Sequence, residues 1–151
     1  MQLIKDQQII NDRLQFIADD QTLPTSGDIS VTLSRWQKER ETLLQHTGKV
    51  GVRLAPADNS ADLATDLDKI SLVEVDFPVY TDGRAFSHAR MLRHHYKYQG
   101  EIRAVGNFMV DQVFYLSRVG VNAFQLPNPL QLPLALETLR DFTVNYQPST
   151  Q

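Results

Sequence analysis

One region in the middle of the chain carries side chains that suit the binding of an anion. Asp82 opens a turn that brings Arg84 to the start of a predicted helix, where free backbone N–H groups favour negative charge. Gly106 and Asn107 join a predicted strand to the next helix in a similar way, close in sequence to Arg103. The predicted anion-binding residues are therefore Arg84, Arg103, Gly106 and Asn107. The structural alternative is that Asp82 caps the helix and Arg84 faces water.

Carboxylates of the same region could act in acid–base catalysis. Asp111 lies in the first turns of the helix that follows residue 107, and it could serve as a general base beside Arg103. Asp82 and Asp111 could form a carboxylate cluster with Asp76, which ends an earlier predicted strand. The candidate catalytic residues are Asp111, Arg103 and Asp82. In the structural alternative, Asp111 is buried and an arginine neutralises it.

The sequence predicts no metal site and contains no cofactor motif. His94 and His95 are neighbours on a predicted helix, and His88 lies two turns before His95, so no pair has the spacing that brings two imidazoles to one metal ion. The chain has no cysteine, which excludes disulfides, thiolate iron–sulfur ligation and a cysteine nucleophile. The glycine patterns of dinucleotide and P-loop sites are also missing. A flavin stays compatible with the sequence, because it can bind without a short motif.

A basic segment suits contact with an acidic protein. Residues 81–103 contain five Arg and Lys against two Asp and Glu, a net charge of +3 in a chain whose net charge is −3. Arg90 and Lys97 share one face of the predicted helix, and Arg93 lies beside that face. These three residues are the candidate partner contacts. The alternative is a helix face that contacts only water.

The hydrophobic pattern predicts an α/β scaffold for these residues. Four apolar, β-branched runs alternate with four short helices, as in βα units on a parallel sheet. We expect a small, mostly parallel sheet of about four βα units, either open or curled like part of a barrel, preceded by an N-terminal β-hairpin within residues 3–17. Four strands are too few to close a parallel barrel, which favours the open form.

The 151 residues are predicted to form a single α/β domain. Residues 1–33 hold the hairpin and a loop, residues 34–142 hold the βα core, and residues 143–151 form a flexible polar tail. The run ISVTL is expected to be extended, and Ser34 is expected to cap a helix over residues 35–46.

The predicted fold also places a ligand site. In open α/β sheets, ligands bind beyond the carboxyl ends of the strands. Ala55 and Asp58 follow the first predicted strand of the core, Asp76 and Asp82 end or follow the second, and Asn107 follows the third. We therefore expect a small-molecule site at this edge of the sheet.

Bulk properties narrow the function classes. The net charge of −3 argues against broad nucleic-acid binding. No apolar run is long enough to span a membrane, and the N-terminus lacks the pattern of a secretory signal, so we expect a cytoplasmic protein. A homodimer is a further expectation, through an exposed apolar patch formed by Phe77, Tyr80 and Phe108.

The chain resembles a bacterial family of uncharacterised proteins in several motifs: TDGR followed by FSHARMLR, then GEIRAVG and DQVFYLSRVG, with SRWQKER and GVRLAP upstream. Members of that family are labelled as oxidoreductases of sulfite reduction. The resemblance implies a role beside the sulfite reductase haemoprotein of assimilatory sulfate reduction, and it offers no established catalytic residues. Where family members often have Arg-Cys-Gly, this chain has Arg118, Val119 and Gly120, so the resemblance implies no cysteine redox role.

Two hypotheses follow. The first is an accessory protein of sulfite reduction that docks on the reductase system without catalysing a reaction. The alternative is a small enzyme, in line with the oxidoreductase label, or an oxyanion-binding protein, with its site at the carboxyl ends of the parallel strands. The sequence leaves open whether the chain is an enzyme.

Overall fold

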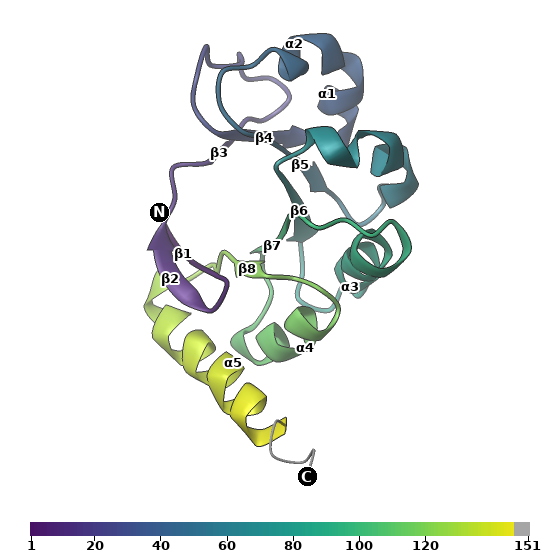
Figure 1. Ribbon diagram of the computed structural model, residues 1–151. Helices are drawn as coiled ribbons and strands as arrows, with labels where there is room; N and C mark the ends of the chain where they lie inside the picture. The colour runs from purple at the N-terminus through teal and green to yellow at the C-terminus, as the bar shows by residue number, and fades with distance from the viewer. Residues whose placement is uncertain (147–151) are drawn as a thin grey trace.

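A curled, mixed β-sheet organises the molecule. The computed structural model describes the backbone of residues 1–146 and the side chains of residues 1–140. Within these residues, eight strands form one sheet in the order β2-β1-β8-β7-β6-β5-β4-β3. In Figure 1 the strands follow an arc that opens to the left, an open half-barrel.

The strands are β1 (Gln2–Lys5), β2 (Gln8–Asn11), β3 (Gln15–Phe16), β4 (Ile29–Thr32), β5 (Val50–Leu54), β6 (Leu72–Phe77), β7 (Glu101–Gly106) and β8 (Ala123–Phe124). The α-helices are α1 (Leu33–Lys38), α2 (Arg40–Leu44), α3 (Arg84–Arg90), α4 (Val113–Arg118) and α5 (Leu132–Tyr146). Shorter or tighter helical segments are η1 (Ser60–Lys69), η2 (Met91–His95), η3 (Val110–Gln112) and η4 (Pro129–Gln131).

Strands β3 to β8 are parallel and lie in sequence order, whereas β1 pairs antiparallel with both β2 and β8. Right-handed crossovers between sequential parallel strands place the connecting helices on one face of the sheet. Accordingly, α1, α3 and α4 lie on the outer side of the arc (Figure 1). The inner, concave face receives no helix from these crossovers.

The alternation of side chains along the strands separates an apolar outer layer from a polar inner face. Val73 and Val75 of β6 belong to the main hydrophobic core, which they share with Leu63 of η1 and Leu92 of η2. The intervening Glu74 points to the inner face and is nevertheless fully buried. The inner face is therefore enclosed as well, and its polar groups need partners there.

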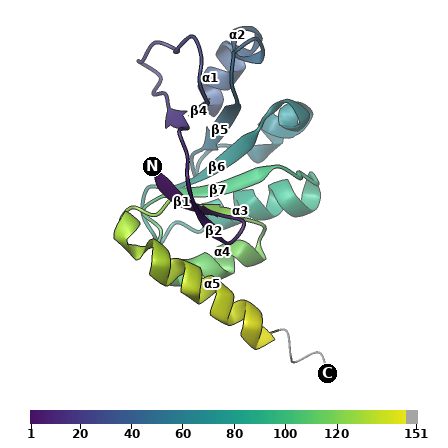
Figure 2. The ribbon, with the colours of Figure 1, turned by 60° about the vertical axis from the view of Figure 1, so that its left-hand side comes forward.

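The segment between β2 and β3 covers the inner face. In both ribbon views it runs from the edge that holds the N-terminal hairpin to the opposite edge of the sheet (Figures 1 and 2). We call residues 12–14 of this segment the strap. Leu14 of the strap is buried, with 4% of its surface exposed, and Asp12 forms an ion pair with Arg103 of β7. The strap thus ties the two edges of the half-barrel to its middle.

The predicted α/β class and N-terminal hairpin are confirmed, but the sheet is larger than expected and mixed. The hairpin ends at residue 11, and Gln15–Phe16 forms β3 at the far edge of the sheet. The run ISVTL supplies β4, a full member of the parallel sheet. Period-2 alternation identifies extended segments but does not determine which strand each one pairs with, and this explains the two missed parallel strands.

Two helix predictions also change. The helix expected over residues 35–46 is divided into α1 and α2, and its cap is Thr32, whose hydroxyl oxygen accepts the N–H of Arg35 at 3.2 Å. Helix α5 extends to Tyr146, so residues 143–146 of the predicted tail are helical. Residues 147–151 of that tail lie outside the described residues.

Candidate functional site

A pocket of about 380 Å³ opens at the carboxyl ends of strands β3 to β6. We call it the mouth pocket. Its lining residues come from four strands and the segments that follow them: Phe16, Asp19, Thr32, Leu33, Ser34, Arg53, Ala55, Asp58 and Asp76. The sequence places Ala55, Asp58 and Asp76 at strand ends, and the structure brings these three together in one wall.

Among the described residues, Arg53 is the only cation that lines this pocket, and its guanidinium is held from two sides. Its Nε donates to Glu74 Oε1 at 2.9 Å. Its Cζ lies 3.8 Å from the centroid of the Phe16 ring, in a cation–π contact. Among the described residues, its two terminal nitrogens form no hydrogen bond or ion pair. A guanidinium fixed through Nε and stacked on a ring presents its remaining N–H groups in the planar geometry that binds carboxylates and similar oxyanions.

Register explains why Arg53 and Glu74 meet. The parallel pairing places Thr32 opposite Arg53, Arg53 opposite Glu74, and Glu74 opposite Arg103. The same row continues through Ala123 of β8 to Lys5 of β1. Charged residues on adjacent strands therefore form a line across the inner face.

Two members of this row are buried with incomplete hydrogen bonding. Glu74 Oε2 and Arg103 Nη1 have no hydrogen-bond partner among the described residues. The two side chains are 0% and 1% exposed. Buried charges with unpaired atoms reduce the stability of a fold. Such groups are rare in native structures and call for an explanation, of which a binding site is one.

Carboxylates complete the walls of the mouth pocket. Asp19 Oδ1 accepts the hydroxyl of Thr32 at 2.6 Å, and Asp58 Oδ2 accepts the backbone N–H of Ala55 at 2.8 Å. Each of these carboxylates is oriented through one oxygen, and its other oxygen has no hydrogen-bond partner among the described residues. Burial raises the pKa of Asp76, even though the charge of Arg53 acts in the opposite direction. The pocket therefore combines one fixed guanidinium with three acidic side chains.

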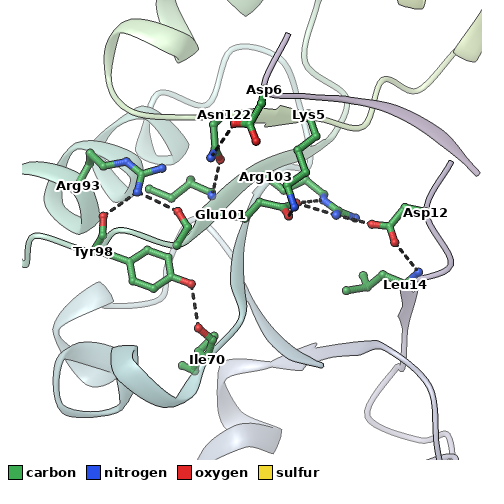
Figure 3. A network of polar contacts seen from close by, with 12 residues as sticks. Lys5, Asp6, Asp12, Leu14, Ile70, Arg93, Tyr98, Glu101, Arg103 and Asn122 are labelled. Carbon is green, nitrogen blue, oxygen red and sulfur yellow. Dashed lines mark hydrogen bonds and ion pairs between the residues drawn. The ribbon is translucent and has the colours of Figure 1, made fainter. Parts of the chain in front are cut away.

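Next to the pocket, Arg103 holds the strap to the sheet (Figure 3). Its Nη2 lies 2.5 Å from Asp12 Oδ2 and 2.6 Å from Glu101 Oε2. Lys5 adds a further ion pair to Glu101, at 3.1 Å. Burial by itself would raise the pKa of Asp12, but the hydrogen bond and the charge of Arg103 outweigh burial and lower that pKa. Arg103 is therefore already neutralised by residues of its own chain.

The other predicted anion-binding residues have local partners. Arg84 forms a two-pronged contact with Asp82, at 3.0 Å from Nε and 2.8 Å from Nη2, and its backbone N–H also donates to Asp82. Asp82 thus accepts the first backbone N–H of α3, whose N-cap residue is Gly83, and Arg84 pairs with Asp82 instead of contacting only water. Asn107 donates through Nδ2 to Pro78 O at 2.8 Å, and Gly106 holds a φ of +92° beside it. The structure does not bring these residues together with Arg103, which faces the strap.

The predicted general-base arrangement around Asp111 is not present. Asp111 is exposed, so its expected burial was wrong. It lines a hollow of about 460 Å³ together with Phe108, Met109 and Leu134. The carboxylates that pair with Arg103 lie on the strap and on β7, as described above, and Asp82 pairs with Arg84. The three candidate catalytic residues therefore do not form one cluster.

The basic segment is partly used inside the fold. Arg93 turns inward and donates through Nη1 to the carbonyl oxygen of Tyr98 at 2.6 Å (Figure 3). It also donates to the carbonyl oxygen of Gly100 through Nη1 and to that of Gly120 through Nε and Nη2, all within 3.1 Å. Arg90 and Lys97 are exposed, and neither forms an ion pair with a described residue. Two of the three predicted partner contacts thus remain available on the surface.

The apolar patch expected for a homodimer is not exposed as a whole. Phe77 and Phe108 are 0% and 3% exposed and belong to the core, whereas Tyr80 is 52% exposed. The expected exposure of both phenylalanines was wrong, because their strand and loop pack beneath α3 and beside Phe124.

His88 contacts Ala55 O at 3.0 Å, behind the mouth pocket. Among the described residues, no group of three His, Asp or Glu could hold a metal ion.

The sequence contains a signal for Arg53 and Glu74 that was not used. Arg53 interrupts the apolar residues of VGVRL, and Glu74 lies between two valines of LVEVDF. A charge between the apolar residues of a parallel strand is unusual, and opposite charges on neighbouring strands predict a pair. Phe16 gives no such signal, because its role depends on the pairing of β3 with β4.

Comparisons with known proteins identify the family. No helix among the described residues combines the length and the apolar character needed to cross a membrane. A search of curated proteins found no match. The model of a family described as bacterial protein of unknown function, DUF934, matches residues 51–151. Since this match covers more than half of the sequence, the chain belongs to the DUF934 family of bacterial proteins.

Proposed function

We propose that the protein binds a small molecule in the mouth pocket and holds an oxyanion group of that molecule on Arg53. The observation that carries this proposal is the fixed guanidinium: Glu74 and Phe16 hold it at the pocket wall, and among the described residues its two terminal nitrogens have no hydrogen-bond or ion-pair partner. The position supports the same conclusion, since open α/β sheets bind ligands at the carboxyl ends of their strands. The contact between the ligand oxyanion and Arg53 is needed whether the protein only binds the ligand or also catalyses a reaction on it.

The anion site proposed here differs from the one expected from sequence. Arg84 and Arg103 already have carboxylate partners, whereas Arg53 shares only its Nε with one. Glu74 engages Arg53 through Nε, so the two terminal nitrogens of the guanidinium keep open donor positions among the described residues. A ligand oxyanion would accept hydrogen bonds from N–H groups that are already positioned.

Binding is tested by thermal shift followed by calorimetry with sulfite, sulfate, phosphate, small carboxylates, amino acids and flavins. We expect at least one oxyanion-bearing compound to bind. Arg53→Lys keeps a cation beside Glu74 but removes the planar fork, so it should weaken binding by at least about tenfold. Arg90→Gln, which removes an exposed guanidinium, is the matched control.

Because Arg53→Lys could also disturb the fold, a second variant replaces both members of the pair, as Arg53→Gln with Glu74→Gln. It removes both charges of the pair together and keeps similar shapes. The proposal fails if no oxyanion-bearing compound binds the native protein, or if both variants fold and bind as tightly as the control.

A second candidate function is docking on the sulfite reductase system in the cytoplasm, as the family resemblance implies. Exposed Arg90 and Lys97, without ion pairs to described residues, support contact with an acidic surface. Co-purification with the sulfite reductase haemoprotein of the same organism at low salt tests it. Replacement of both residues by Glu should abolish the complex, whereas Lys38→Glu, at an exposed position of α1, should not. Absence of a complex with the native protein at low salt would refute this function.

A further inference from the structure

We infer that the ligand of the mouth pocket is a small zwitterion, with an ammonium group as well as the oxyanion group, for which an α-amino acid is the simplest model. This inference rests on the proposed function and adds the second half of the ligand. It follows from the charges and open hydrogen-bonding positions of the pocket walls.

The charge balance of the pocket disfavours a simple anion. Within the part of the chain that the structure describes, Arg53 supplies the only positive charge of the lining, whereas Asp19, Asp58 and Asp76 supply three carboxylates. Glu74, bonded to Arg53, adds a fourth acidic group beside the pocket. An anion on Arg53 would therefore approach several carboxylates of like charge. A cation alone would be attracted by the carboxylates but would leave the Arg53 fork unused.

A zwitterion satisfies both sets of groups at once. Its oxyanion group can accept from the two terminal nitrogens of Arg53, as carboxylates do in two-pronged contacts. Its ammonium group has three N–H donors and needs acceptors around it. Asp19 and Asp58 each accept a hydrogen bond from a neighbouring residue through one carboxylate oxygen. The other oxygen of each has no hydrogen-bond partner among the described residues. These open oxygens and the carboxyl group of Asp76 are the acceptors for the ammonium group.

The size and the remaining walls of the pocket agree with this ligand class. A volume of about 380 Å³ lies near the lower end of the range for small-molecule sites. Phe16 and Leu33 add apolar surface beside the charged groups, and Thr32 and Ser34 add hydroxyls. A short side chain of an amino acid would contact these residues while its charged groups occupy the positions described above.

The experiment compares three kinds of probe by calorimetry at neutral pH: acetate with only the anion, methylamine with only the cation, and each of the common L-α-amino acids with both. We expect at least one amino acid to bind at least about tenfold more tightly than acetate or methylamine. Asp58→Asn should weaken the amino acid but leave acetate unchanged or slightly tighter, because it removes a carboxylate that repels an anion. Asp20→Asn, next to Asp19 and exposed, is the matched control.

The outcomes separate this inference from the proposed function. If acetate or another simple oxyanion binds as tightly as every amino acid, and binding depends on Arg53, the zwitterion is wrong and the oxyanion site stands. If no probe and no other oxyanion-bearing compound binds the native protein, both are wrong. If an amino acid binds but Asp58→Asn and Asp19→Asn, both folded, leave its affinity unchanged, the assignment of the ammonium position is overturned.

Discussion

Replacement of Arg103 by methionine tests how the strap is held on the half-barrel. Arg103 is 1% exposed and lies within 2.6 Å of both Asp12 and Glu101. Methionine fills much of the space of the arginine stem, but it leaves two carboxylates facing each other without their shared cation. One of them belongs to the strap and the other to β7, so the repulsion acts on the contact that closes the inner face.

The expected loss of stability is large. Breaking a buried ion pair by removal of one partner destabilises a protein by about 3–5 kcal/mol. Asp12 keeps 21% of its side chain exposed and Glu101 retains Lys5 at 3.1 Å, so we expect the lower end of that range, about 3 kcal/mol. Urea unfolding at pH 7, followed by the fluorescence of the single tryptophan, Trp36, measures this loss.

A pH series sharpens the test. Arg103 lowers the pKa of Asp12 below its usual 3.8, against the effect of burial. A lowered carboxyl pKa stabilises the fold above the unfolded value, and this contribution is lost as the pH falls through the folded value. The difference between the native protein and Arg103→Met should therefore shrink below about pH 4.

The matched control is Arg13→Met, which removes the same group from an exposed strap position and should change stability by no more than about 0.5 kcal/mol. If Arg103→Met is as stable as this control at pH 7, the ion pairs do not hold the strap. If its deficit stays constant toward acid, for as long as both proteins are folded, Asp12 is not the carboxylate that Arg103 stabilises.

Three further predictions concern single sites. Asp76→Asn should stabilise the protein at pH 7, because burial raises the pKa of the Asp76 carboxyl group and makes its charged form unfavourable in the fold. The gain in stability should disappear below about pH 4, where the carboxyl group is protonated in both the folded and the unfolded protein. Melting temperatures across pH measure this, and a destabilised variant at pH 7 would contradict it. Gly106→Ala should destabilise the protein by at least about 2 kcal/mol in urea unfolding, because φ is +92° and a Cβ atom would lie 2.4 Å from a backbone carbonyl oxygen. Gly83→Ala is the control, because nothing lies within 4 Å of its added Cβ atom. Equal stability of the two variants would refute the clash. Tyr98→Phe should remove a buried hydrogen bond worth about 1 kcal/mol. Burial raises the pKa of Tyr98 from 10.0 to about 12, so the native protein should lose stability as the pH rises through that interval. An equal loss of stability in the variant would show that Tyr98 is not its cause.

Some parts of the fold and of the site follow from local sequence patterns. The alternation in the hairpin and the β-branched runs that end at Leu54, Phe77 and Gly106 predict strands β1, β2, β5, β6 and β7 at nearly their observed bounds. Because carboxyl ends of parallel strands lie on one edge, the positions of Asp58 and Asp76 near a ligand site are predictable too. These features depend on a few residues around each position, so a single sequence contains them.

Other features depend on residues that are distant in the chain. Arg103 and Asp12 are 91 positions apart, and only the course of the strap across the inner face brings them together. Gln15 and Phe16 have no local pattern that separates them from the hairpin, and Phe16 reaches Arg53 because β3 joins the opposite edge of the sheet. The sequence by itself determined the period of each element and the outer apolar layer. Only the tertiary structure decided which charges on the inner face neutralise each other, and that the terminal nitrogens of Arg53 have no partner among the described residues. The reason is that pairing across the sheet is set by the global packing of the chain and not by the spacing of residues within one element.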